Sequence, residues 1–561
     1  MRKIILLAIV TIAVLTQACI RDTGNYDYRD INQLQFVGFE VVEIDNVNGG
    51  VTHRVDSIIG RSSANPINVE DPQEGLWLTP VIRTSMNTEE NLVFTWLTID
   101  TLGNQAVFHE GRNLEDFRVL SGWSGTTTVT FRIEDVVSRK ILNTNITLNV
   151  VNRFQTGYLV LQEYQGYMRL DMLSWLPGVR YTHFRNVLDS TDVPFPRQRG
   201  ARYIVNIVDH VRAVAFGGRS IYIVTDEPDV FRIRPLTFDF LGDQGHLRNA
   251  FLPPSSFPDT LNVTRFASTT TNSALLNMEG NLFYQSQSDN RFFSIRWNMT
   301  EEREFFRASR HFSRASQRYV VFDEDAQSFY TLTPYRFTFA RQIPARDDTL
   351  TSFRNMGKEL VFSGYSSSFI TPSPPVVPPP SPETLSDNIL LSRDANGNVN
   401  EFWMLRFIIQ NFRQLFWQRM EVPPGFADYF NGAPVPRPVM AVGGEFAHRQ
   451  MYIAVGGNVY QYDLHNNRST RVLTLPPGEV ITYMGFITHN RHADPDRDHP
   501  NHGRDAHRFI IIAHYNAGSG VGTLTHYRIP AGTASLIPYI NPNTGQLHSW
   551  TGFGRIVDVS F

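Results

Sequence analysis

The sequence is poor in cysteine, with one residue at position 19 among 561. A single thiol excludes intramolecular disulfides and cysteine-based zinc sites. If Cys19 is modified, as its setting below predicts, thiol catalysis is excluded as well. The folded protein must then derive its stability from buried apolar surface, which a chain of this length can supply.

An excess of positive charge is also missing, since the formal net charge is −3. Nothing in this balance favours nucleic acid as a partner. Beyond the first residues, no apolar run approaches the roughly 18 residues that a membrane-spanning helix requires. The mature chain is therefore expected to be globular and not membrane-spanning, in keeping with 42% hydrophobic and 12% aromatic residues.

Motifs of catalysis are absent too. The sequence has no Gly-x-Ser-x-Gly elbow, no His-Glu-x-x-His zinc motif and no sialidase Asp-box. Paired carboxylates for glycoside hydrolysis are defined by their separation in space and cannot be found from spacing. We predict no catalytic residue, no metal site and no cofactor, and a protein that is not an enzyme.

The first 18 residues predict an export signal. Arg2 and Lys3 precede an apolar run over 4–15, which is too short to span a bilayer and has the length of a signal-peptide core. Ala18-Cys19 then resembles the end of a bacterial lipobox, although Thr16 occupies the position where leucine is usual. We predict lipidation at Cys19 and attachment to the outer membrane. The alternative is an ordinary signal peptide with an incidental cysteine. Several acyl chains anchor stably where one does not.

Short β-rich runs separated by Gly, Asn, Asp and Pro predict an all-β protein. After a tether over 19–32, a first domain is expected over 33–151. It contains a strand over 91–100 with Trp96 available for a core, and two strands over 126–136 and 141–151 joined at Ser138-Arg139. About 120 residues of this kind suit an immunoglobulin-like sandwich.

The second region, 152–561, repeats a β-rich run, a polar turn and another β-rich run about seven times. One such hairpin per four-stranded blade predicts a β-propeller of about seven blades. The final run, 555–561, is expected to close the ring by pairing with the first blade. A large sandwich-like repeat is the alternative. The hairpins are expected over 158–173, 220–233, 281–297, 319–332, 388–405, 451–464 and 509–529.

Three segments within this region attract functional hypotheses. The Pro-rich insertion 371–383 is either an exposed connection or a docking site. The His- and Asp-rich segment 489–507 is either a solvated loop or a metal site, although His499 stands where a calcium loop needs glycine. Gly518–Gly522 is expected to be a hairpin turn and not a phosphate loop, because no helix follows it. The run 400–420 suits either a helix or two strands.

Aromatic side chains are candidates for flat platforms that stack on sugar rings or peptide side chains, although most are expected in blade cores. Three arginines near two of these tryptophans, Arg406, Arg413 and Arg419, are equally ambiguous. No ligand-binding residue is assigned. The tryptophans in question are Trp77, Trp123, Trp175, Trp297, Trp403, Trp417 and Trp550.

The residues after Cys19 carry a more specific signal. Asp22, then Gly24-Asn25-Tyr26-Asp27-Tyr28, then Ile31-Asn32 resemble the start of PKD-like family lipoproteins, with Thr23 where lysine is common. The segments 91–100, 130–136 and 157–173 fit the same layout. The Trp-x-Phe-Gly-Asp-Gly signature of better-known PKD domains is absent, so the resemblance implies only a sandwich.

That resemblance implies an accessory lipoprotein of a starch-utilisation-type (SusC/SusD-like) outer-membrane uptake system. The implied partners are a TonB-dependent transporter and its substrate-binding lipoprotein, with a glycan or peptide as ligand. The expected location is the outer membrane, lipid-anchored and facing the cell exterior. The alternatives are a propeller hydrolase or lyase acting on polysaccharide, and a surface adhesion protein.

Overall fold

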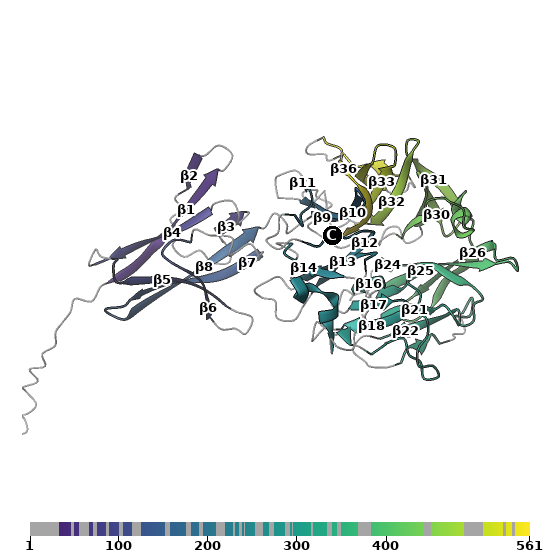
Figure 1. Cartoon of the computed structure of the whole chain (residues 1–561), viewed down its shortest axis with the longest axis horizontal. Coiled ribbons are helices and arrows are strands. Elements are labelled where there is room, and N and C mark those ends of the chain that lie inside the picture. The colour runs from purple at the N-terminus through teal and green to yellow at the C-terminus, as the bar shows by residue number, and fades with distance from the viewer. Residues whose placement is uncertain are drawn as a thin grey trace, which may run out of the picture.

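The structure is a computed structural model of the whole chain (Figure 1). It describes residues 33–45, 50–54, 67–70, 76–85, 89–99, 105–114, 125–151, 157–174, 181–189, 195–208, 219–227, 230–234, 238–240, 242–252, 262–268, 274–285, 292–293, 295–315, 318–333, 339–344, 349–368, 383–442, 450–486, 509–530, 535–540 and 545–560.

The N-terminal part consists of two sheets with strand orders β2-β1-β4 and β3-β8-β7-β5-β6. Neighbouring strands in these sheets pair antiparallel except for β3 and β8, which pair parallel. The strands are β1 (Leu34–Asp45), β2 (Gly50–Arg54), β3 (Ile67–Glu70), β4 (Leu76–Thr84), β5 (Leu92–Ile99), β6 (Gln105–Glu110), β7 (Gly125–Asp135) and β8 (Lys140–Val151).

Both sheets contribute to one hydrophobic core. Leu34 and Leu78 from the first sheet pack with Trp96, Phe131 and Ile146 from the second. Trp96 is fully buried and its indole N–H donates to the carbonyl of Gly111 at 3.1 Å, so its one polar group is satisfied. The predicted strands and the core position of Trp96 are confirmed. Alternation in β7 buries Val129, Phe131 and Ile133 because successive side chains point to opposite faces.

The C-terminal part begins with β9 (Gly157–Tyr164) and contains twenty-nine strands, which we number to β37. Those of the first three sheets are β10 (Tyr167–Ser174), β11 (Thr182–Phe184), β12 (Ala201–Val208), β13 (Arg219–Thr225), β14 (Phe231–Ile233), β15 (Phe251–Leu252), β16 (Val263–Ser268), β17 (Ala274–Met278), β18 (Asn281–Gln285) and β19 (Phe292–Phe293), with 3-10 turns η2 (Gly242–Gly245) and η3 (Leu247–Ala250).

The remaining four sheets follow in chain order, and the last strand, β37, then joins the first sheet. Their elements are β20 (Ser313–Ala315), β21 (Arg318–Asp323), β22 (Ser328–Leu332), β23 (Arg341–Gln342), β24 (Glu359–Ser368), β25 (Glu383–Arg393), β26 (Val399–Ile408), β27 (Gln414–Arg419), α2 (Phe426–Phe430), β28 (Val439–Val442), β29 (Gln450–Val455), β30 (Asn458–Asp463), β31 (Arg468–Thr474), β32 (Glu479–Phe486), β33 (Phe509–Asn516), β34 (Val521–Arg528), β35 (Ile537–Pro538), β36 (Ser549–Phe553) and β37 (Arg555–Ser560).

These strands form seven sheets that follow one another around a ring, which is a β-propeller (Figure 1). Each sheet contains one of the seven predicted hairpins, so the all-β class and the repeat are confirmed. We number the sheets as blades 1 to 7 from β9 onward. The run 400–420 is two strands, β26 and β27. Gly518 and Gly520 lie in the hairpin turn between β33 and β34, and Gly522 lies at the start of β34.

The last strand closes the ring, as predicted. β37 pairs antiparallel with β9, so blade 1 has the order β11-β10-β9-β37 and joins the two ends of the domain. β37 also contacts β12 of blade 2 and β32 of blade 7. It is therefore the innermost strand of blade 1, and Figure 1 shows the C-terminus near the middle of the ring.

The innermost strands β37, β12, β16, β20, β24, β28 and β32 all enter the ring from one end, which we call the leading face. Five of them have a register shift close to their start, between Ala201 and Tyr203, Val263 and Arg265, Leu360 and Phe362, Ile481 and Tyr483, and Ile556 and Asp558. A bulge changes the direction of the following side chains. The residues that follow these shifts are Tyr203, Arg265, Phe362, Tyr483 and Asp558.

Candidate functional site

A cavity of about 580 Å³ opens on the leading face between blades 3, 4 and 5. Its walls come from the turn between β17 and β18, the segment 307–311 before β20, the start of β24 and the helix α2. Arg307, Arg310, Arg393 and His311 line it together with Tyr429. Its volume falls in the range of small-molecule sites.

The segment 307–311 has no regular secondary structure and is held by hydrogen bonds to blades 3 and 4. The buried side-chain amide of Asn277 donates to the carbonyls of Ala308 (3.1 Å) and Ser309 (2.9 Å). The Ala308 N–H donates to the carbonyl of Gly280 at 2.9 Å. Gly280 has φ +88°, and a Cβ there would lie 2.9 Å from Arg307, so glycine permits this close approach.

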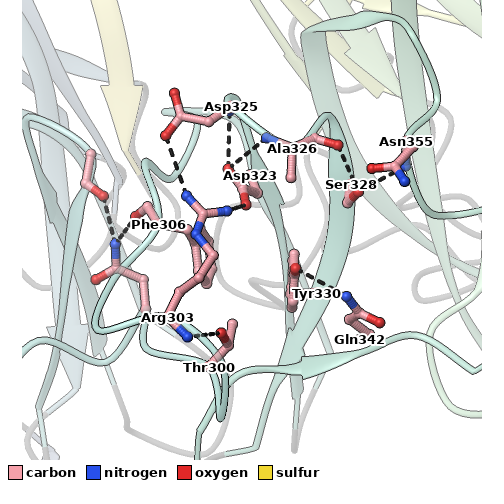
Figure 2. Close-up of polar contacts among 12 residues, drawn as sticks. Thr300, Arg303, Phe306, Asp323, Asp325, Ala326, Ser328, Tyr330, Gln342 and Asn355 are labelled. Carbon is pink, nitrogen blue, oxygen red and sulfur yellow. Dashed lines mark hydrogen bonds and ion pairs between the residues drawn. The ribbon is translucent and has the colours of Figure 1, made fainter.

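A second network fixes the same segment from blade 4 (Figure 2). Arg303 reaches the buried carboxylate of Asp323 at 2.6 Å, and Asp323 also accepts the backbone N–H groups of Asp325 and Ala326. Ser309 N–H donates to the carbonyl of Phe322 at 2.8 Å. These contacts are structural, because they satisfy every group involved and orient the turn beside the cavity.

His311 is surrounded by positive charge. Burial lowers the pKa of His311 well below its usual value, and the guanidinium groups of Arg310, Arg437 and Arg265 lower it further. Nε of Arg310 donates to Nε2 of His311 at 3.2 Å, which requires a neutral imidazole. Arg310 is therefore in direct contact with a neutral His311, and the charges of Arg437 and Arg265 also disfavour its protonation.

The arginines also affect one another. The pKa of Arg437 is lowered first by burial and then by the charges of Arg310 and Arg265, while Tyr429 acts in the opposite direction. Pro436 and Pro438 flank Arg437 and restrict its backbone just before β28.

The carboxylates at the cavity already have partners. Glu324 pairs with Arg307 at 3.1 Å, and Glu359 pairs with Arg393 at 2.9 Å. Glu279 accepts from the Asn262 amide at 3.0 Å. Among the described residues, no carboxylate forms an ion pair with Arg265, Arg310 or Arg437. The cavity lining contains three arginines, Arg307, Arg310 and Arg393, and three glutamates, Glu279, Glu324 and Glu359, so its formal charges balance.

The bulges described above place Tyr203, Arg265, Tyr483 and Asp558 near the axis. Burial raises the pKa of Asp558 to about 6, although Arg265 and the N–H groups of Ile204 and Val559 favour its charged form. Ile204 N–H donates to Asp558 at 2.8 Å. The hydroxyl of Tyr483 donates to the carbonyl of Val559 at 3.1 Å. These two hydrogen bonds connect β12 and β32 to the closing strand, β37.

The arginines proposed from the sequence have other roles. Arg406 is buried in an ion pair with Asp387, and Arg419 pairs with Glu401 at 3.2 Å. Arg413 is exposed in the connection between β26 and β27. None of the three lines the cavity.

The tryptophans do not form a free platform in the described part of the chain. Trp403 and Trp417 stack on each other at 4.8 Å, and the Lys358 ammonium covers Trp403 at 4.7 Å. Trp297 is buried, and Trp550 packs against His526. The side chain of Trp77, together with Trp123 and Trp175, lies outside the described residues.

Other predicted features also lie outside the described residues. These are Cys19 with its signal peptide and tether, the Pro-rich run up to residue 382, and the His- and Asp-rich segment 489–507. Within the described ranges, no group of three or more His, Cys, Asp or Glu side chains could hold a metal ion. The helices found there are too short or too polar to cross a membrane.

The sequence analysis did not single out the residues that line the cavity. Arg307 and Arg310 stand shortly before β20, the first strand of blade 4. Once seven hairpins are assigned, residues just before each innermost strand are expected at one end of the ring. The sequence therefore offered that signal, but it did not show that blades 3, 4 and 5 form one cavity.

Comparisons with known proteins give no family for this chain. No family model matches the sequence, and no curated protein matches it. Solved structures with a similar arrangement include a quinoprotein alcohol dehydrogenase-like protein from Bacteroides thetaiotaomicron, with 8% identity, a TM-score of 0.38, and coverage of 88% of this chain and 96% of that one.

Two further structures are similar at the same low level. AztD from Citrobacter koseri has 7% identity and a TM-score of 0.34, over 83% of this chain and 100% of that chain. The WD40 domain of SCAP from fission yeast has 10% identity and a TM-score of 0.28, over 60% and 71%. These likenesses carry no argument about activity, and the propeller assignment rests on the sheet order and the ring closure.

Proposed function

We propose that this protein is a lipid-anchored, cell-surface binding component of a TonB-dependent nutrient uptake system. Its ligand is a glycan or peptide, and the cavity on the leading face binds it. The observation that carries the proposal is this cavity, which three blades form together and which is lined by arginine, glutamate, aromatic and apolar side chains. A pocket shared by several blades is a typical ligand site of a propeller.

The outer-membrane location depends on the sequence. Acyl chains on Cys19 would hold the protein in the membrane, and residues 19–32 would act as a tether. The two N-terminal sheets, which we propose to be an immunoglobulin- or PKD-like sandwich, would then carry the propeller away from the membrane. The resemblance of the residues after Cys19 to PKD-like lipoproteins supports this arrangement and the transporter as a partner.

Binding is favoured over catalysis by the chemistry of the cavity. The ring nitrogen of His311 that would act as a base accepts a hydrogen bond from Arg310, and no hydroxyl is paired with it among the described residues. A general base needs hydrogen-bond access to the proton it removes. The adjacent arginines also keep His311 neutral and weakly basic.

The test is a mild-detergent pull-down of the tagged full-length lipoprotein from its own outer membrane, read by mass spectrometry. We expect stoichiometric recovery of a TonB-dependent transporter and its substrate-binding lipoprotein. The matched control is Cys19→Ala, which should leave the membrane fraction and lose both partners. Recovery of the wild-type protein alone, with the transporter detected elsewhere in the membrane, would overturn the uptake role.

A further inference from the structure

Four large apolar side chains are exposed together at one end of the N-terminal sheets. Val136 and Val137 lie in the turn between β7 and β8, Val93 lies on β5 and Ile141 lies on β8, and each is between 47% and 56% exposed. Val93 and Ile141 both pair with Glu134 of β7, so they lie on one face of the sheet next to the turn. We call these four apolar residues the apolar tip.

Hydrogen bonds hold the turn in place, so the exposure of its valines is part of the folded structure. The buried carboxylate of Asp135 accepts the backbone N–H groups of Val137 at 2.9 Å and Ser138 at 3.1 Å. The N–H of Val136 donates to the carbonyl of Asn91 at 3.0 Å, which ties the turn to the start of β5. A group of adjacent exposed apolar side chains is a feature of surfaces that contact another protein or a membrane.

The chain that leads from Cys19 enters the N-terminal sheets at this same end. The N–H of Gln33 donates at 2.8 Å to the hydroxyl of Ser85, the residue after β4, and β5 begins seven residues after Ser85. Fourteen positions separate Cys19 from Gln33, and a chain of that length reaches at most about 50 Å when fully extended. β8 runs from this end to the opposite end, from which the chain continues to the propeller. An anchor at Cys19 therefore makes the apolar tip the membrane-facing end of the N-terminal sheets.

The charges beside the apolar tip suit a phospholipid surface. Arg139 and Lys140 directly follow the two valines, both are exposed, and neither forms an ion pair in the described part of the chain. Of the carboxylates at this end, Glu89 already has an arginine partner, whereas Glu90 and Glu134 lie on the strand side of the turn. Glu134 stands between Val93 and Ile141, which keeps that row among the polar head groups and leaves the turn as the part that enters more deeply.

We infer that the apolar tip is a second contact with the membrane and that its partner is an anionic phospholipid surface. Val136 and Val137 enter the boundary between head groups and acyl chains, and Arg139 and Lys140 contact the phosphate groups. The inference rests on the proposed lipid anchor at Cys19, because two valines bind a bilayer only weakly unless a tether holds them beside it. The anchor and the apolar tip together fix how the N-terminal sheets stand on the membrane.

The test attaches the chain to vesicles at its single cysteine. Residues 19–561 are coupled through the Cys19 thiol to a maleimide lipid in vesicles of phosphatidylcholine and phosphatidylglycerol, so the result does not depend on natural lipidation. Hydrogen–deuterium exchange of the coupled chain is compared by mass spectrometry with that of the same chain capped with N-ethylmaleimide. We expect exchange across 136–141 to slow by about ten-fold on the vesicles, which requires the contact to be formed about nine-tenths of the time.

Variants assign the residues. Val136→Ser combined with Val137→Ser, and Arg139→Gln combined with Lys140→Gln, should each reduce the slowing to about two-fold or less. All four side chains are exposed, so the sheets should stay folded, and thermal melting checks this. The matched control is Val521→Ser, an exposed valine beside a turn of the propeller, which should leave the slowing unchanged. Vesicles of phosphatidylcholine alone should give a smaller slowing, because they lack the negative charge.

Unchanged exchange across 136–141 in the coupled chain would overturn the membrane contact, and so would full slowing in both double variants. Slowing that appears in the capped chain as its concentration rises, without vesicles, would identify a second copy of this chain as the partner and reject the membrane. These outcomes are separate from the pull-down, because the vesicles contain no transporter and chemical coupling replaces the natural anchor. A failed pull-down therefore rejects the uptake role alone, and an unprotected tip rejects the membrane contact alone.

Discussion

Two regions of the propeller contain histidines whose pKa is lowered by burial, and they differ in whether charged side chains lower it further. In the cavity, His311 is partly buried and lies in the field of three arginines. Where blade 7 meets the closing strand, His526 is fully buried among Tyr158, Tyr181 and Trp550. Burial alone lowers the pKa of the neighbouring His548 to about 4.

This difference in surroundings distinguishes a histidine at a candidate binding site from a histidine in a stabilising core. Solvent reaches the exposed guanidinium of Arg310 beside His311, and exposed charges contribute little to folding. The aromatic cluster around His526 is buried and stabilises the fold. A lowered histidine pKa therefore occurs both at the wall of the cavity and in a core.

The largest expected effect tests whether the closing strand carries the stability. Val559 of β37 is 5% exposed and packs in the core that joins blades 1 and 7. Val559→Asp buries an unpaired carboxylate and should lower the free energy of unfolding by more than about 3 kcal/mol in urea denaturation. Arg310→Gln should change it by less than about 0.5 kcal/mol.

The control is the same substitution at an exposed valine of the same domain, Val521→Asp, where the side chain is 39% exposed. We expect only a small change there. If Val559→Asp unfolds no more easily than Val521→Asp, ring closure by β37 does not stabilise the propeller.

The next largest effect is a loss of folding stability at low pH. A histidine with a lowered pKa in the folded state binds protons more readily when unfolded, so its stabilising contribution is present above about pH 6.5 and is lost as the pH falls. For His548 the decrease in pKa to about 4 corresponds to about 3 kcal/mol lost between pH 6.5 and 4. His526 adds to this loss, because burial and His548 hold its pKa well below normal.

His526→Phe tests this assignment. Neither ring nitrogen of His526 has a hydrogen-bond partner in the described residues, so we expect phenylalanine to stabilise the protein by about 1 kcal/mol at pH 7. The loss of stability from pH 7 to 4, measured by thermal melting, should be smaller than in wild type. The exposed His465→Phe serves as control, and an unchanged acid profile in His526→Phe would contradict burial as the cause.

The smallest effect distinguishes the two histidine environments directly. Salt screens charges that solvent reaches, and it has little effect on the consequences of burial in an apolar core. Raising the NaCl concentration should therefore raise the pKa of His311 in NMR titrations, while His526 should remain neutral over the same pH range. An unchanged pKa of His311 would mean that the arginines do not act on it.

Several elements followed from local sequence patterns. The seven hairpins, strands β7 and β8 and the buried Trp96 are consequences of alternating side chains and polar turns, which act over a few residues. Even the pairing of the last strand with the first blade could be predicted, because an open ring would leave an unpaired sheet edge.

The site did not follow in the same way. Arg310 is separated from Arg393 by more than 80 positions in the sequence, and nothing local distinguishes these arginines from Arg406, which forms a buried ion pair with Asp387. The bulge between Val263 and Arg265 also changes the direction of the Arg265 side chain without a sequence signal that we recognised.

By itself, then, the sequence determined an all-β chain with a repeated hairpin, a closing strand and an expected lipid anchor at Cys19, because these depend on local periodicity and on short motifs. Only the tertiary structure decided which arginines pair with carboxylates and which side chains line the cavity. The reason is physical: ion pairs depend on distances in space, and the ring brings together residues from blades 3, 4 and 5 that the chain keeps far apart.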